Sequence, residues 1–321
     1  MKGKKGHKAK WFILAAILLS GCSGDDSPNN TNTNNGKDSE IRFNADVGRM
    51  MEGTRATTID NTALQDQDIL IDAYHHDNGT AYLSNAKLHY DSSWKFWDSS
   101  TSSQLHYYWP EGGSLDFVGY CPYTQPDYIT SEEYDHTTGA SFSCNLSSYM
   151  TNASQASMQE YLIAVLNEQT LATQTAAGGA LPLVFKHPFA LVKFVIAEGS
   201  GTVKINGISI AGLKTSGTCT YNGSAMSWSS QSGSTDMTIT PATPLKYGTA
   251  STETTPFIVI PHNYGSMTLT VNGTWDDWSD VTKDLSTNIS INWESGCIYT
   301  YNLTVTKYAL KVDTEKYTEQ W

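Results

Sequence analysis

Apolar and polar residues alternate with a period of two over long parts of this chain, a pattern typical of half-buried β-strands. The first such stretch predicts a strand whose buried face carries Ile41, Phe43, Ala45 and Val47. The same alternation predicts strands over residues 267–271, 289–293 and 299–305. Continuous apolar runs predict strands covered on both faces over residues 181–185, 189–196 and 257–260.

The segments between these strands are rich in Gly, Ser, Asn, Asp and Thr, which favour turns. A single short helix is expected near residues 154–159. This organisation predicts an all-β protein built from two β-sandwiches. Two glycines at 199 and 201 interrupt the apolar pattern and place a domain boundary there, giving domains over residues 40–199 and 200–321. A hairpin turn inside one domain is the alternative.

The composition supports a folded protein and argues against one class of partner. Of the 321 residues, 39% are hydrophobic, which suits a globular chain. The formal net charge of −12 argues against a general nucleic-acid binder. The basic residues are unevenly placed, because five lysines fall within the first ten positions. The N-terminus therefore needs an explanation of its own.

The N-terminus has the features of a lipoprotein signal peptide. The lysines are followed by nine apolar residues over 11–19 and then by Ser20, Gly21 and Cys22. Nine residues at about 1.5 Å each are too short to cross a bilayer core of roughly 30 Å. Residues 1–21 are therefore expected to be a signal that is removed, and Cys22 to receive lipid. An ordinary signal peptide with a coincidental cysteine is the alternative.

The segment that follows is expected to be a flexible tether. Residues 22–39 are polar and lack large apolar side chains, so they cannot bury enough surface to offset their ordering entropy. Without residues 1–21 the chain has 15 basic and 32 acidic residues, a net charge of −17. Such a charge favours solubility and indicates no particular chemistry.

No catalytic or metal-binding constellation is recognisable in the sequence. His75 and His76 are adjacent, so on a strand their side chains would point to opposite faces. His187 has no candidate partner near it in sequence. Nucleotide-binding, serine-hydrolase and zinc-protease motifs are missing. The sequence therefore predicts a protein without enzymatic activity, cofactor or metal.

Four cysteines remain after the lipidation site. An exported protein can keep disulfides, and bonds within each proposed domain would pair the candidates as Cys121–Cys144 and Cys219–Cys297. Free buried thiols are the alternative.

Two groups of aromatic residues leave a binding function open. Exposed tryptophans could stack on sugar rings, whereas buried ones would fill the sandwich cores. The groups are Trp94, Trp97, Tyr107, Tyr108 and Trp109, and Trp275 with Trp278.

Several segments together resemble the fimbrillin family of Bacteroidia, which supplies subunits of surface fimbriae. Each is short, but their order covers nearly the whole chain after the signal. One departure is Gln159-Glu160, where the family often has Gln-Asp. The segments are the lipobox ending at Cys22, 41–45 (IRFNA), 54–57 (TRAT), 107–110 (YYWP), 115–120 (LDFVGY), 159–164 (QEYLIA), 183–190 (LVFKHPFA), 260–261 (IP) and 296–303.

The resemblance implies two transthyretin-like β-sandwich domains, no enzymatic activity, and an outer-membrane lipoprotein precursor that matures into a fimbrial subunit at the cell surface. It also implies cleavage by a trypsin-like protease after an arginine in the first loop. Arg55, followed by Ala56, is the better match because its neighbours are small and polar, and Arg49 is the second candidate. A loop that is never cut is the alternative.

Cleavage would free the first strand and open a groove that a strand from another subunit could fill. The C-terminal segment, with Leu310 and Val312, is the candidate donor. The partners would then be other fimbrial subunits in a head-to-tail polymer, with a host or bacterial surface ligand for adhesion. The alternative function is a non-polymerising surface lipoprotein that binds glycan or a host ligand through exposed aromatics.

Overall fold

The structure is a computed structural model that describes residues 39–48, 59–196, 203–241, 245–246, 252–275, 281–306 and 308–318. The description leaves out the side chains of residues 245, 246, 252, 275, 281, 317 and 318.

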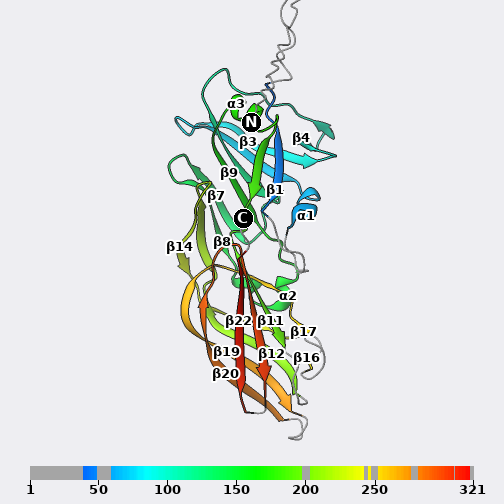
Figure 1. The fold of residues 1–321 in the computed structure, drawn as a ribbon, viewed down its shortest axis with the longest axis vertical. Helices are drawn as coiled ribbons and strands as arrows, with labels where there is room; N and C mark the ends of the chain where they lie inside the picture. Colours follow the sequence, from blue (N-terminus) through cyan, green and yellow to red (C-terminus); the bar gives the residue numbers. More distant parts are fainter. Residues whose placement is uncertain are drawn as a thin grey trace, which may run out of the picture. The chain divides into compact units, whose positions relative to one another are not determined.

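The N-terminal half contains two sheets (Figure 1). The smaller sheet pairs β1 (Phe43–Val47) with β10 (Leu181–Phe185). The larger has six strands in the order β5 (Ser103–Gln104), β4 (Trp94–Asp98), β3 (Ala81–Tyr90), β2 (Ile69–His75), β6 (Leu115–Cys121) and β9 (Leu162–Gln169).

A third sheet takes strands from both halves of the chain, and two further sheets complete the C-terminal half. The third has the order β14 (Met226–Ser232), β13 (Ser216–Tyr221), β8 (Gly139–Asn145) and β7 (Ile129–Asp135). The fourth has β17 (Thr252–Glu253), β11 (Ala190–Ile196), β21 (Cys297–Val305) and β22 (Leu310–Thr318), and β18 (Phe257–Val259) also pairs with β11. The fifth has β15 (Thr235–Ile239), β12 (Val203–Leu213), β19 (Asn263–Trp275) and β20 (Val281–Asn292), with β16 (Leu245–Lys246) on β12.

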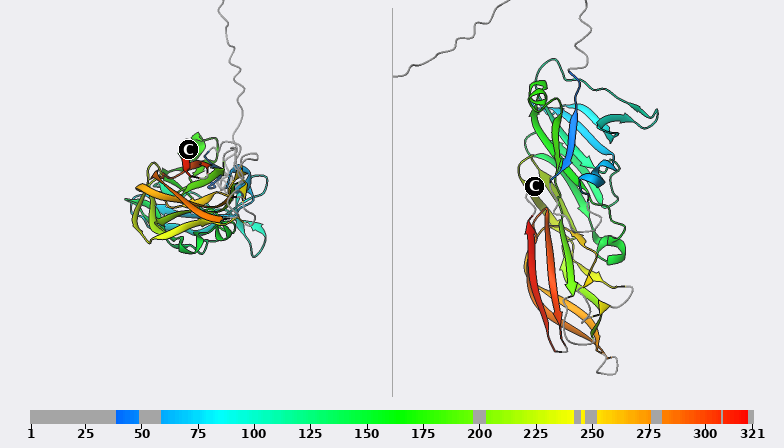
Figure 2. Two further views of the ribbon diagram at one scale, coloured as in Figure 1. Left: turned by 90° about the horizontal axis from the view of Figure 1, so that it is seen from below. Right: turned by 45° about the vertical axis from the view of Figure 1, so that its right-hand side comes forward.

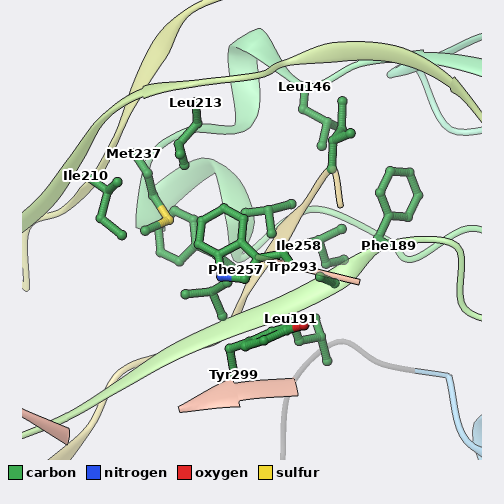
Figure 3. Close-up of a cluster of buried hydrophobic side chains, with 14 of the residues drawn as sticks. Leu146, Phe189, Leu191, Ile210, Leu213, Met237, Phe257, Ile258, Trp293 and Tyr299 are labelled. Carbon is green, nitrogen blue, oxygen red and sulfur yellow. The ribbon is translucent and has the colours of Figure 1, made fainter. Parts of the chain in front are cut away.

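The buried side chains form two clusters. The N-terminal core lies between β1, β10 and one face of the six-stranded sheet, and it includes Phe43, Phe117 and Leu183. The other face of that sheet, with Tyr120, joins a second cluster that continues through the third sheet into the C-terminal half. Figure 3 shows part of this C-terminal core around Phe257 and Trp293. All seven residues of β6 are buried because both of its faces are covered.

The strands agree closely with the sequence pattern. The alternating segments correspond to β1, β19, β20 and β21, and the last four strands, β19–β22, lie together in orange and red (Figure 2). The prediction that residues 181–185 are covered on both faces is wrong, because β10 alternates and Val184 is 36% exposed. This strand has β1 beside it, and only its odd-numbered residues face the core.

The expected helix is displaced, and two others escape the sequence pattern. Helix α2 covers Asn152–Gln155 rather than 154–159 and is capped by the Thr151 side chain. Helices α1 (Asn61–Gln65) and α3 (Leu171–Ala176) and the 3-10 turn η1 (Ser147–Tyr149) are as short. Segments of one or two turns cannot display a 3.6-residue period, and a side-chain cap marks the start of each of the three α-helices instead, whereas η1 has no such cap.

The domain boundary proposed near residue 199 stays a prediction, because residues 197–202 lie outside the described residues. The β-pairing of β8 with β13 joins strands from both sides of it. Residues from Ser39 onward form one compact unit. The two halves therefore share a sheet as well as a core.

A half-buried carboxyl on β7, that of Glu132, makes the stability depend on pH. Burial, and to a smaller extent Asp72, raises the pKa of Glu132 above its ordinary value of 4.5, while a hydrogen bond donated by the Tyr161 hydroxyl lowers it. The folded state then binds this proton more tightly than the unfolded state. This contribution to the free energy of unfolding is fully present below the ordinary pKa and is lost as the pH rises through the raised one.

We therefore expect Glu132→Gln to unfold with a weaker dependence on pH than the wild type. Urea unfolding between about pH 4 and 8 measures this. Glu133→Gln, at the exposed next position on the strand, is the matched control. An unchanged pH profile in Glu132→Gln would contradict the expectation.

Candidate functional site

The first strand is an edge strand that pairs in parallel with β10. Phe43 lies opposite Leu181, and Val47 lies opposite Phe185. Two further backbone hydrogen bonds extend the pairing: the Leu181 amide donates to the Arg42 carbonyl at 2.8 Å, and the Gly48 amide donates to the Phe185 carbonyl at 3.3 Å. Within the described residues, β10 is the only strand that pairs with β1.

The inward face of this segment fills the N-terminal core as the alternation predicts. Ile41, Phe43 and Val47 are at most 2% exposed, and Ala45 is half-buried. The Phe43 ring lies edge-on to Phe117 at 5.1 Å and to Phe96 at 6.0 Å between centroids. Each of the three large side chains contributes roughly 1.5–3 kcal/mol by its burial.

Side chains, rather than a further strand, cover the outer edge of β1. The Trp94 indole Nε1 donates to the Ala45 carbonyl at 3.1 Å. The Val47 amide donates to Asn61 Oδ1 at 2.6 Å. These contacts satisfy backbone groups that an open sheet edge would leave exposed. Because both contacts are made to the backbone of β1, a strand of different sequence in the same place could make them too.

A buried glutamine holds the segment just before β1. Gln174 is 3% exposed, accepts from the Arg42 amide at 2.9 Å and donates to the Glu40 carbonyl at 2.8 Å. Burial raises the pKa of the Glu40 carboxyl, but hydrogen bonds from His106 and Arg42 outweigh it and hold the pKa below its ordinary value. Glu40 is therefore an ion-pair acceptor in this segment.

A buried hydrogen bond between a carboxyl and a histidine lies where the chain resumes after residues 49–58. Glu160 and His187 are hydrogen-bonded, and their side chains are 2% and 4% exposed. The second Glu160 oxygen accepts from the Ile59 amide at 3.0 Å. The partner of His187 is not apparent from the sequence, because Glu160 lies 27 residues away along the chain. The pair fixes the start of the segment that leads to α1, while β1 is fixed by β10.

The predicted modification sites cannot be placed. The lipidation site Cys22, the cleavage site Arg55–Ala56 and the alternative Arg49 lie outside the described residues. The segment 49–58 that contains both arginines connects β1 to Ile59.

The predicted donor segment forms β22, at the edge of its sheet beside β21. Leu310 is buried and Val312 half-buried, whereas residues 311 and 313–316 are exposed. Few apolar side chains therefore hold this strand in place.

Neither predicted disulfide is present. Cys121, Cys144, Cys219 and Cys297 are all buried, and none of these four described cysteines forms a disulfide. Cys121 belongs to the N-terminal core and Cys144 to the other cluster, while Cys219 and Cys297 lie on strands of different sheets. Burial raises the pKa of the Cys144 thiol to about 12, which keeps it protonated and unreactive.

The aromatic residues do not form an exposed row. Trp109 is 9% exposed, Trp94, Trp97 and Tyr107 are partly buried, and only Tyr108 is exposed in this group. Trp278 and the side chain of Trp275 lie outside the described residues. The first group packs as a core does, which removes the support that it gave to a sugar-stacking surface.

Two further properties concern only the part of the chain that the structure describes. None of its helices is long and apolar enough to span a membrane. It contains no group of three or more His, Cys, Asp or Glu side chains that could hold a metal ion. His76, considered as a ligand above, instead hydrogen-bonds Asp116 at 2.8 Å.

Two solved structures share this fold. One is a candidate cell adhesion protein of Bacteroides uniformis, with 17% sequence identity, a TM-score of 0.53, and coverage of 88% of this chain and 99% of that one. The other, a candidate cell adhesion protein of Bacteroides ovatus, has 17% identity, a TM-score of 0.53, and coverage of 88% and 96%. None of the curated proteins matches the chain. The model of the fimbrillin-like family matches residues 54–321. This chain therefore belongs to the fimbrillin-like family.

Proposed function

We propose that this chain is a fimbrial subunit that assembles when a protease cuts after Arg55 and a strand of another subunit replaces β1. The fimbrillin-like family consists of structural subunits of cell-surface fimbriae, so the chain is not an enzyme and its partners are other fimbrial subunits. Lipidation at Cys22, which would hold the precursor at the outer membrane, and adhesion to a surface ligand belong to the same proposal.

One observation carries the proposal: a strand that contributes three buried side chains to a core is held at a sheet edge and leads directly into the segment that contains Arg55. Loss of this strand would leave an apolar groove and an unpaired edge on β10. Both are liabilities in water, and a strand added in the same place would remove both.

The candidate donor is β22, because it too is an edge strand and few of its side chains are buried. Donor and acceptor are different surfaces of the subunit. A contact of this type is head-to-tail and continues as an open filament.

The test is to treat the chain lacking residues 1–21 with trypsin, and then to determine the new N-terminus and the oligomeric state. We expect a new N-terminus at Ala56, loss of the fragment that carries β1, and a ladder of oligomers. Arg49→Ala should give the same new N-terminus as the wild type, and the double variant Arg49→Ala/Arg55→Ala, which has no arginine or lysine left within residues 49–58, should stay monomeric. A cut chain that keeps β1 and remains a monomer would refute strand exchange, and a cut after Arg49 instead of Arg55 in the wild type would refute the cleavage site.

A further inference from the structure

The most exposed large hydrophobic side chain among the described residues is Tyr308, at 74%. It lies in the turn between β21 and β22. The turn is closed by a hydrogen bond from the Thr306 amide to the Ala309 carbonyl at 2.9 Å and by one from the Ala309 amide to Thr306 Oγ1 at 3.1 Å. A side chain with this exposure contributes little to the core of its own subunit.

Tyr308, Leu310 and Val312 stand at every second position of the donor segment. When the turn opens and the chain becomes extended, Tyr308, Leu310 and Val312 project to one face. From the N-terminal end, this face therefore carries an aromatic residue, an aliphatic residue and a valine. The inward face of β1 has the same order at the same spacing, with Phe43, Ala45 and Val47.

The place that Phe43 occupies is suited to an aromatic ring. The rings of Phe96 and Phe117 lie edge-on to the Phe43 ring. Such aromatic pairs stabilise a core by more than the burial of their apolar surface alone. Ala45 is half-buried, so a leucine there has room toward solvent. Valine replaces valine at position 47.

The release of β22 would expose little apolar surface. Among the side chains of β22 that the structure describes, the apolar ones facing inward are Leu310, which is buried, and Val312, which is half-buried. The backbone of β22 pairs with β21 from Leu310 to Thr318, and hydrogen bonds to the five residues of β10 in the acceptor would replace part of this ladder. Opening the turn would let the chain continue beyond Val305 at about 3.3 Å per residue.

We propose that Tyr308 is the aromatic anchor of the donor strand and takes the place of Phe43 in the groove of a second copy of this chain. Leu310 then takes the place of Ala45, and Val312 that of Val47. The inference rests on the proposed function. It adds the register of the donor strand against β10 of the acceptor and the donor residue that contributes most to binding.

The test uses the trypsin-cut chain from which the β1 fragment has been removed, with labelled peptides as probes. A peptide of residues 40–48 shows whether the groove is open, and a peptide of residues 305–314 tests the donor. We expect both to bind. Tyr308→Ala in the second peptide should weaken binding roughly tenfold or more, since buried aromatic anchors dominate such contacts. Tyr308→Phe should bind at least as well as the wild-type peptide.

Lys311→Ala is the matched control, because Lys311 lies on the other face of the strand and its side chain is 72% exposed. It should bind like the wild-type peptide. In the full chain, Tyr308→Ala should fold normally and form shorter ladders after cleavage.

The outcomes separate the two proposals. If the Tyr308→Ala peptide binds as tightly as the wild-type peptide, Tyr308 is not the anchor. If residues 40–48 bind and residues 305–314 do not, the donor assignment is wrong and the exchange groove stands. The groove would then be filled by a strand from a subunit whose sequence differs from this one. If neither peptide binds, the groove itself is refuted, and the proposed function with it.

Discussion

Replacing Phe43 with alanine is expected to lower the free energy of unfolding by about 3–5 kcal/mol. The ring is 2% exposed and contacts Phe96 and Phe117, so its removal leaves a cavity as well as lost burial. Because β1 pairs with a single strand among the described residues, the weakened strand should also detach more often than the rest of the fold. Urea unfolding measures the first effect, and hydrogen exchange of the β1 amides measures the second.

Asn44→Ala is the matched control for this substitution. Asn44 is the next residue of the same strand, and its side chain is exposed. Its replacement should change the stability by no more than about 0.5 kcal/mol. A loss below about 1 kcal/mol in Phe43→Ala would mean that the strand is not an integral part of the core.

Replacing His187 with alanine should be as damaging, by about 3–5 kcal/mol, for an electrostatic reason. The change leaves the Glu160 carboxyl buried without its histidine partner, while the Ile59 amide still donates to its second oxygen at 3.0 Å. Beyond the loss of stability, the segment that begins at Ile59 should lose its attachment. Thermal or urea unfolding measures the stability, and limited proteolysis near residue 59 reports the attachment.

His89→Ala provides a control of the same chemistry at the surface. His89 Nδ1 lies 2.7 Å from Asp68 Oδ1, but the two side chains are 38% and 34% exposed. An exposed pair of this kind contributes about 0–1 kcal/mol. Equal losses in the two variants would show that burial does not strengthen the Glu160–His187 pair.

The strands could be predicted from the sequence because the signal is local. Alternation at Phe43 and Val47, or along β19–β21, depends only on neighbouring residues and on one face being buried. The all-β architecture follows from the same signal. Helices α1 and α3 could not be found in this way, since their start depends on single capping side chains.

The contacts that hold β1 could not be predicted, because each joins residues that are distant along the chain. Trp94 and Gln174 look in the sequence like any aromatic or polar residue, yet both bind the backbone around β1. The partner of His187 is likewise set by the tertiary fold. Pairing of β1 with β10 brings together the two ends of the N-terminal half. Periodicity contains no information about such pairings.

The parallel pairing of β1 with β10 has a consequence for what a single hydrolysed bond would do. The strand next to β1 in the sheet is not the one that follows it along the chain, so no hairpin links the two. Any cut within residues 49–58 therefore severs the covalent connection of β1 to everything after it. Before the cut, the strand rebinds at an effective concentration in roughly the millimolar range. After the cut, β1 is a separate peptide that can dissociate from the groove. Dilution alone then favours its dissociation.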